Sequence, residues 1–314
     1  MLCCKNLMRS LKWFAVLMSI ISNSQAQIDP RVADYSVADS IALNFPDAKP
    51  YDYVELASRL TKDLDSEHDK FRAIFRWITD NITYHYGNRS GDPKRVLKKQ
   101  KAVCIGYSSL LRDMCLAIGI ECEVISGFSK TTVEDIGKRF KTPDHAWNAV
   151  NIYDKWYLVD VTWATSYYDK QKRKIIKQFN ETYFLTDPTY FGWKHFPTDP
   201  HWQLSDKPIS LSQFKKGPIF YSGLIENHIE DITPGKGTLK IKQQKKSLEL
   251  TFLTHTEPRF ITISLGDDLN YFPDIEKDGD LYIARQIFDK PGTHEMTIFI
   301  NGIGVATYKL IVKK

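Results

Sequence analysis

The stretch from Lys101 to Gly119 reads KAVCIGYSSLLRDMCLAIG, and it predicts a helix that begins near Cys104. Apolar side chains recur there at helical spacing, and Gly119 suits the C-terminal cap; the apolar positions are Leu110, Leu111, Met114, Cys115 and Ile118. A helix start favours a thiolate because its free N–H groups and its dipole attract an anion. The same N–H groups are suited to stabilising the oxyanion of a tetrahedral intermediate.

Three strand-like segments follow this helix, at 121–128, 145–153 and 156–162. The last two alternate in apolar character and flank Asp154-Lys155, which is typical of a hairpin turn. A helix followed by adjacent strands predicts an α+β domain with an antiparallel sheet.

The hairpin brings a histidine and an aspartate within a few residues of facing each other. His145 opens its first strand, and Asp160 lies near the end of its second. A histidine near a thiol can take its proton, and an acid on the far side fixes the imidazole tautomer. Taken singly, each residue also has a structural explanation: Cys104 as a small packing residue, His145 as a half-buried polar residue and Asp160 as a turn former.

Three motifs raise the catalytic interpretation above the structural one, because together they resemble the transglutaminase-like superfamily. Residues 101–108 resemble its cysteine motif, 144–150 its histidine motif and 156–163 its aspartate motif. Their order matches as well, and the resemblance extends over roughly 66–206. Residues 183–204 further resemble the branch that includes kyphoscoliosis-peptidase-like proteins, which carry β domains after the core.

The resemblance implies a papain-like core in which Cys104 is the nucleophile, His145 the base and Asp160 the orienting acid. Cys104 would attack an amide carbonyl of a protein or peptide, commonly that of a glutamine side chain, and form a thioester. An amine would then give a crosslink, whereas water would give deamidation or hydrolysis. No cofactor or metal is expected, and nothing in the chain resembles the calcium loops of animal crosslinking transglutaminases.

Other aromatic and histidine side chains receive weaker predictions. The family's oxyanion side chain is sought in Trp77 or Tyr84, with a core role favoured for Trp77. Trp147 and Trp163 are expected to wall the site. Among the histidines, His85 is a candidate for lining the cleft, and two are interpreted as packing or surface residues: His195 and His201.

The N-terminus predicts a secretory signal over 1–26. A basic start is followed by an apolar run at 13–21, which is too short to span a bilayer, and by small residues before a cut after Ala26. A secreted or periplasmic protein is therefore expected; an uncleaved anchor is the alternative. Removing this segment takes three basic residues away and lowers the formal charge from +5 to +2. A near-neutral chain argues against a broad nucleic-acid surface, and short lysine runs are usually solvated.

The cysteine count leaves one pairing question open. Cys115 and Cys122 are expected either to pair, leaving Cys104 as the odd thiol, or to be small buried apolar residues. No cysteine and histidine spacing typical of a structural zinc site occurs.

The chain is divided by prediction into a catalytic domain at 27–208 and a β domain at 209–314. Short β-type runs separated by turn residues recur through the second part, which is the pattern of an immunoglobulin-like β-sandwich. A protein or polysaccharide is the expected partner of this β domain. No second apolar run approaches membrane-spanning length.

The sequence thus favours an exported transglutaminase-like cysteine acyltransferase or hydrolase that acts on protein or peptide amides. A cysteine peptidase of the cell envelope is the first alternative. The second is a non-catalytic interaction protein that keeps the core as a scaffold. The presence of all three catalytic residue types argues against the scaffold, but it does not separate acyl transfer from peptide cleavage.

Overall fold

The computed structural model describes residues 29–31, 33–46, 52–169, 172–243, 247–266 and 269–314. The expected signal segment at 1–26, with its cut after Ala26, lies outside these residues. The chain divides into two compact units, 1–34 and 35–314. In the first unit the Arg31 guanidinium pairs with the Asp29 carboxylate at 2.6 Å.

The second unit begins with helices. Their bounds are α2 Ser36–Leu43, α3 Tyr53–Thr61, α4 Glu67–Asn81, α5 Pro93–Lys99 and α6 Cys104–Leu116. Short polar side chains cap two of them: the Ser66 hydroxyl accepts the N–H of Asp69 at 3.0 Å, and the Asp92 carboxylate accepts that of Lys94 at 3.1 Å. Each cap satisfies an N–H group that the helix itself leaves free.

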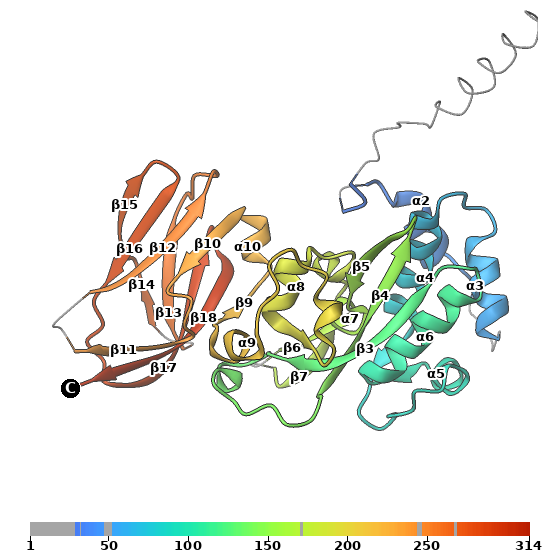
Figure 1. Cartoon of the computed structure of the whole chain (residues 1–314), viewed down its shortest axis with the longest axis horizontal. Coiled ribbons are helices and arrows are strands. Elements are labelled where there is room, and N and C mark those ends of the chain that lie inside the picture. Colours follow the sequence, from blue (N-terminus) through green and yellow to red (C-terminus); the bar gives the residue numbers. More distant parts are fainter. Residues whose placement is uncertain (1–28, 32, 47–51, 170–171, 244–246, 267–268) are drawn as a thin grey trace, which may run out of the picture. The chain divides into compact units, whose positions relative to one another are not determined.

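A four-stranded antiparallel sheet in the order β5-β4-β3-β8 carries the site. Its strands are β3 Cys122–Ser129, β4 His145–Ile152, β5 Lys155–Val159 and β8 His195–Pro197. Helix α6 packs along β3 and β4 (Figure 1), and His145 at the start of β4 is hydrogen-bonded to Cys104 at the start of α6. The α+β architecture with an antiparallel sheet is confirmed.

The β4–β5 hairpin turns one residue earlier than the sequence predicts. Ile152 faces Lys155, so the turn residues are Tyr153 and Asp154, both of which have positive φ, at 50° and 63°. Two such residues make the tight turn whose twist matches a hairpin. The expected turn at Asp154-Lys155 was therefore wrong by one position.

The predicted strand at 156–162 was wrong at its end. Strand β5 stops at Val159, and Asp160 is the N-cap of the short helix α7 (Val161–Thr165). The Asp160 carboxylate accepts the N–H groups of Thr162 and Trp163, each at 2.9 Å, and this bends the chain out of the sheet.

The aromatic segment after α7 forms strands as well as short helices. Its first part forms a separate hairpin, β6 (Ser166–Asp169) with β7 (Lys174–Lys177). Its last part, β8, joins the main sheet at the edge of β3. Between and after them lie three short helices: η2 Glu181–Tyr183, α8 Pro188–Lys194 and η3 Pro200–Gln203.

The rest of the unit is mostly strand, as the sequence predicts. One sheet has the order β10-β12-β16-β15, and the other runs β11-β18-β17-β13-β14 with β9 paired to β18. Their apolar faces share one buried cluster, which includes Phe252, Ile298 and Leu310 and is consistent with a β-sandwich. The elements are α9 Leu211–Lys216, β9 Ile219–Phe220, α10 Gly223–Glu226, β10 Ile229–Thr233, β11 Thr238–Lys242, β12 Leu248–Thr254, β13 Ile261–Leu265, β14 Leu269–Tyr271, β15 Asp274–Asp278, β16 Leu281–Gln286, β17 Gly292–Ile300 and β18 Ile303–Lys313.

Among the described residues, none of the helices has the length and apolar character needed to cross a bilayer.

Candidate active site

The thiol of Cys104 lies at the first residue of helix α6. Strand β2 (Lys101–Ala102) leads into this helix, and Val103 is its N-cap. Cys104 is partly exposed, whereas Cys115 and Cys122 are free thiols in the buried core. The second of the two expectations for Cys115 and Cys122 therefore fits, and Cys104 is the accessible thiol among the three.

His145 opens strand β4 and lies between the thiol and the carboxylate of Asp160. Its Nε2 is 2.7 Å from Oδ2 of Asp160, and its side chain is also hydrogen-bonded to Cys104. Because Nε2 faces the carboxylate, Nδ1 is the nitrogen left for the thiol. The structure thus brings all three sequence-predicted residues into one chain of contacts.

Asp160 is fully buried, and each of its oxygens has a separate task. Oδ1 accepts the two backbone N–H groups that begin α7, whereas Oδ2 faces His145. Using Oδ1 as a helix cap fixes the plane of the carboxylate, and this in turn fixes where Oδ2 points. The local fold therefore orients the acid before any substrate arrives.

The electrostatics of this pair favour a charged histidine. Burial opposes the charge on His145, but attraction and hydrogen bonding to Asp160, with a further hydrogen bond to Cys104, raise the His145 pKa to about 10. Burial likewise opposes the charge on Asp160, but His145 and a second histidine lower the Asp160 pKa well below its ordinary value. A positively charged His145 beside the Cys104 sulfur is thus favoured near neutral pH.

The second histidine is His195, which the sequence interpretation dismissed as a packing or surface residue. It is 1% exposed at the start of β8, and its Nε2 is 3.0 Å from Oδ2 of Asp160. Its ring also stacks on Phe191 at 3.9 Å, so the packing role is present too. The interpretation missed the contact because β8 was not expected to join the sheet beside β3.

Aromatic side chains enclose the contact chain. Trp163 stacks on His145 with ring centroids 5.0 Å apart and an interplanar angle of 22°, and Trp147 is buried beside it at 6.0 Å. Trp77 is 1% exposed within the helical core, as favoured, whereas Tyr84 is near enough to Cys104 to interact with it electrostatically. Burial raises the pKa of Tyr84 to about 12, so its hydroxyl keeps its proton as a donor.

The remaining histidine candidates lie in local contacts of their own. The Nδ1 of His85 accepts the N–H of Gly87 at 3.0 Å, and the ring of His201 packs edge-on against Trp202.

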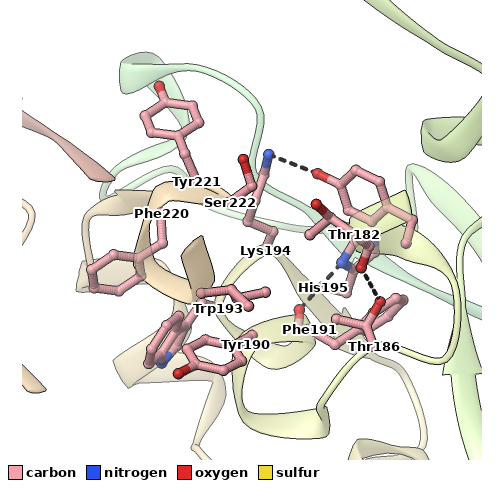
Figure 2. A pocket seen from close by; sticks show the side chains of 12 residues that line it. Thr182, Thr186, Tyr190, Phe191, Trp193, Lys194, His195, Phe220, Tyr221 and Ser222 are labelled. Carbon is pink, nitrogen blue, oxygen red and sulfur yellow. Dashed lines mark hydrogen bonds between the residues drawn. The ribbon is translucent and has the colours of Figure 1, made fainter. Parts of the chain in front are cut away.

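Two hollows lie near the aromatic wall. A cavity of about 30 Å³ is bordered by Lys194, His195 and Phe220 (Figure 2), and it has room for roughly one or two water molecules. A second, open hollow of about 510 Å³ lies beside Trp163 and is lined by Tyr167 and Gln178. Its volume is in the range that holds a small ligand or a peptide side chain.

The nitrogen and oxygen atoms of His145, Asp160 and His195 lie within 4.8 Å of one another, a donor set that could in principle hold a metal ion. The same atoms form the two hydrogen bonds to Oδ2, so protons alone explain the arrangement.

Comparison with known families agrees with this geometry. Residues 54–161 match the family model described as transglutaminase-like superfamily, and this range contains Cys104, His145 and Asp160. Residues 54–161 form a transglutaminase-like domain. His195 lies beyond the matched range, so the family motif alone offers no signal for it.

Curated relatives extend the similarity beyond this domain. Kyphoscoliosis peptidase of Mus musculus is 32% identical over 267 residues, which cover 79% of this chain and 38% of that protein. The Lim and transglutaminase domain protein ltd-1 of Caenorhabditis elegans is 27% identical over 259 residues, covering 74% and 36%. The chain thus spans less than two fifths of the length of these relatives.

Among solved structures, one described as a putative cysteine protease from Cytophaga hutchinsonii is 20% identical. The match covers 41% of this chain and 39% of that one, with a TM-score of 0.30.

Proposed function

We propose that this protein is an exported cysteine acyltransferase or hydrolase that acts on protein or peptide amides through a thioester. The observation that carries the proposal is the contact chain from Cys104 through His145 to Asp160 at the start of a helix. The signal-like pattern of residues 1–26 supports export.

The chemistry can be written from these residues. The Cys104 thiolate adds to the amide carbonyl carbon, and the N–H groups at the start of α6 face the developing oxyanion. The carbon–nitrogen bond then breaks, the leaving amine takes a proton from His145, and a thioester remains. His145 next removes a proton from an amine or a water, which attacks the thioester and releases the Cys104 thiolate.

Cleavage of main-chain amides by the same steps is the second candidate. The similarity to the mouse relative, which is named as a peptidase, favours it. Both activities need the same nucleophile, base and acid. They differ in whether a side-chain or a main-chain amide is attacked, and in whether an amine or water accepts the acyl group.

One assay separates the candidates. The protein is incubated with casein and a fluorescent primary amine, beside Cys104→Ala. Acyl transfer predicts fluorescent casein, and peptide cleavage predicts new amino termini; either product should disappear in Cys104→Ala. Equal product from both proteins would overturn the proposal, and so would the absence of either product if Cys104 is alkylated no faster than Cys115 and Cys122.

A further inference from the structure

The carboxylate of Asp160 accepts four N–H groups, and the one from His195 belongs neither to the Cys-His-Asp chain of contacts nor to the cap of α7. Oδ1 accepts those of Thr162 and Trp163, and Oδ2 accepts those of His145 and His195. Each carboxylate oxygen accepts about two hydrogen bonds, so both are filled. The fourth donor comes from β8, some distance along the chain from the other three.

The ring of His195 is fixed in place by its surroundings. It stacks on Phe191 at an interplanar angle of 19° and packs against Trp163 at 4.3 Å, and Ser129 pairs with it across the β3–β8 ladder. Burial lowers the pKa of His195 to about 4, so the ring is neutral near pH 7 and carries a single N–H. That proton belongs on Nε2, because the charged Asp160 oxygen is a stronger acceptor than the Phe191 carbonyl oxygen, 3.2 Å from Nδ1.

We infer that His195 is a positioning residue that holds Oδ2 of Asp160 and moderates its attraction for the His145 proton. An N–H donated to Oδ2 draws charge from that oxygen, and this weakens the pairing of Asp160 with the imidazolium. His145 then keeps its proton long enough to form the ion pair with Cys104 but can still release it to a leaving group. The inference rests on the proposed function.

Other ionisable groups face the same carboxylate and remain when His195 is changed. The Lys194 amine donates to the Tyr183 hydroxyl at 3.3 Å, and both groups act electrostatically on Asp160. Cys104 acts on the opposite side of His145. The charges around Asp160 are therefore otherwise the same in a His195 variant. A shift in the pH dependence of Cys104 alkylation in that variant is then due to the lost N–H.

The test compares His195→Gln, whose amide can replace the Nε2 donor, with His195→Met, which has similar length but no donor. The rate of Cys104 alkylation by iodoacetamide is measured from pH 5 to 11, because this needs no substrate. The profile should contain an alkaline step at the pH where His145 loses its proton. His195→Met should raise the pH of this step and lower kcat about tenfold, about 1.4 kcal/mol, with KM unchanged. His195→Gln should restore both.

Two results would overturn the inference. One is an alkaline step at the wild-type pH in His195→Met. The other is equal impairment of both variants, which would reduce His195 to packing. Because alkylation requires no turnover, a protein that alkylates as expected but makes no product would refute the proposed function and leave this inference standing.

A second and independent feature is the charge next to Cys104. The segment from Arg89 to Lys101 contains six basic residues and one acidic residue, Asp92, so its formal charge of +5 equals that of the whole chain. The basic side chains are exposed, and none forms an ion pair within the part of the chain that the structure describes; they are Arg89, Lys94, Arg95, Lys98, Lys99 and Lys101.

Asn88 holds the two ends of this segment together and links them to Val103, the residue before the thiol-bearing helix. The Asn88 carbonyl accepts the N–H of Val103 at 3.2 Å, and the Asn88 side chain donates to the carbonyl of Lys101. Lys101 itself lies in strand β2, three residues before Cys104. The segment that carries the positive charge therefore lies beside the start of the helix that bears the nucleophile.

We propose that the segment from Arg89 to Lys101 binds an acidic stretch of the substrate polypeptide next to the reacting amide. Clustered charges of one sign raise the local concentration of an oppositely charged partner, and salt weakens this effect. A polypeptide fits better than a nucleic acid because the rest of the chain has no net positive charge to extend the surface. This proposal also rests on the proposed function.

Binding is measured by fluorescence anisotropy in the Cys104→Ala protein, so that turnover plays no part. The probes are a labelled peptide with glutamine flanked by glutamates and one with the flanks replaced by serine. The acidic peptide should bind at least tenfold more tightly at low salt and lose this advantage in 0.5 M NaCl. Replacing Lys94, Lys98 and Lys101 by Gln should abolish the difference.

A matched control removes the same charge from exposed lysines of the β11 region, Lys236, Lys240 and Lys242, and it should leave the preference intact. Equal binding of the two peptides, or equal loss in both triple variants, would overturn the proposal. Loss of binding to phosphatidylglycerol vesicles in the first variant, without any peptide preference, would assign the surface to a membrane instead.

Discussion

At the scale of single residues, the two oxygens of Asp160 have different hydrogen-bond partners and different tasks. One oxygen begins helix α7, and the other orders the two histidines. A carboxylate that is fixed by backbone donors on one side keeps its other oxygen aimed without help from substrate. The acid is therefore both a structural cap and a source of charge, and a substitution can separate the two tasks.

Asp160→Asn separates the capping of helix α7 from the negative charge. The side-chain oxygen of asparagine can still accept the N–H groups of Thr162 and Trp163, but the negative charge that raises the His145 pKa to about 10 is lost. The His145 pKa should fall toward its ordinary value, and the imidazolium that holds the Cys104 thiolate should be lost at pH 7. Alkylation of Cys104 by iodoacetamide should slow by about tenfold or more, whereas an unchanged rate would contradict the assigned role.

The site consists of Cys104, His145, Asp160 and His195, and the first three could be predicted from the sequence. Cys104, His145 and Asp160 each lie in a recognisable motif, and the helix and hairpin that carry them show clear periodicity. His195 could not be predicted because its contact depends on where a three-residue strand is placed after a turn-rich segment. The residues of β8, His195-Phe196-Pro197, are too few to show the alternation that would predict a strand, and they give no sign of its partner.

At the scale of elements, the pairing of β3 with β8 decides whether His195 reaches the site. Gly127 lies at this junction, opposite His145 on one side and Pro197 on the other. A Cβ atom there would collide with the Trp147 ring and with the backbone of Phe196 and Pro197. The absence of a side chain at Gly127 is what lets β8 approach.

Gly127→Ala should therefore lower the free energy of unfolding by about 1–3 kcal/mol, because backbone must move to admit the methyl group. Urea denaturation measures it. Gly192→Ala is the control: it lies in helix α8 with open space around its Cα, and it should be neutral or slightly stabilising. Equal stability of the two variants would show that β8 does not depend on this close approach.

Boundaries of elements were the least predictable part at this scale. The hairpin was expected, but its turn was placed one residue too late. Neither Tyr153 nor Asp154 is a glycine, so the residue types do not predict two successive positive φ angles. The end of β5 was missed for a similar reason. Val161 and Thr162 are strand formers, and only the capping hydrogen bonds of Asp160 direct them into a helix.

At the scale of the whole molecule, we propose that the chain folds as a catalytic part at 27–208 followed by a β part at 209–314. The apolar cluster of the β part also receives Tyr190 and Trp193 from α8. Lys130, at the end of β3, donates to the carbonyls of Gly217 and Pro218 at 3.2 and 3.0 Å. These contacts cross the proposed boundary and should make the two parts unfold together.

The contribution of Lys130 to the free energy of unfolding depends on pH. Burial lowers the Lys130 pKa from 10.5 to about 7. Between these values the unfolded chain binds the proton and the folded chain does not, so this contribution to the free energy of unfolding rises with pH. Below pH 7 both states are protonated, and the contribution is constant.

Lys130→Met should remove this rise in the free energy of unfolding with pH. The stability of the wild type relative to Lys130→Met should grow between pH 7 and 9, by at most about 1.4 kcal/mol per pH unit. Taking the difference cancels the opposite trend from His145, whose raised pKa adds stability below pH 6.5 that is lost as pH rises toward 10. A difference independent of pH would show that Lys130 keeps its charge in the folded protein.

The most direct test of the central claim is an acid-quenched single turnover, followed by mass spectrometry of the peptide that contains Cys104. With the protein in excess over casein peptides, we predict an acyl adduct on Cys104 that hydroxylamine removes, as expected for a thioester. The adduct should be absent in Cys104→Ala and should form more slowly in Asp160→Asn. Product formation without any adduct on Cys104, or at an equal rate in Cys104→Ala, would contradict the account.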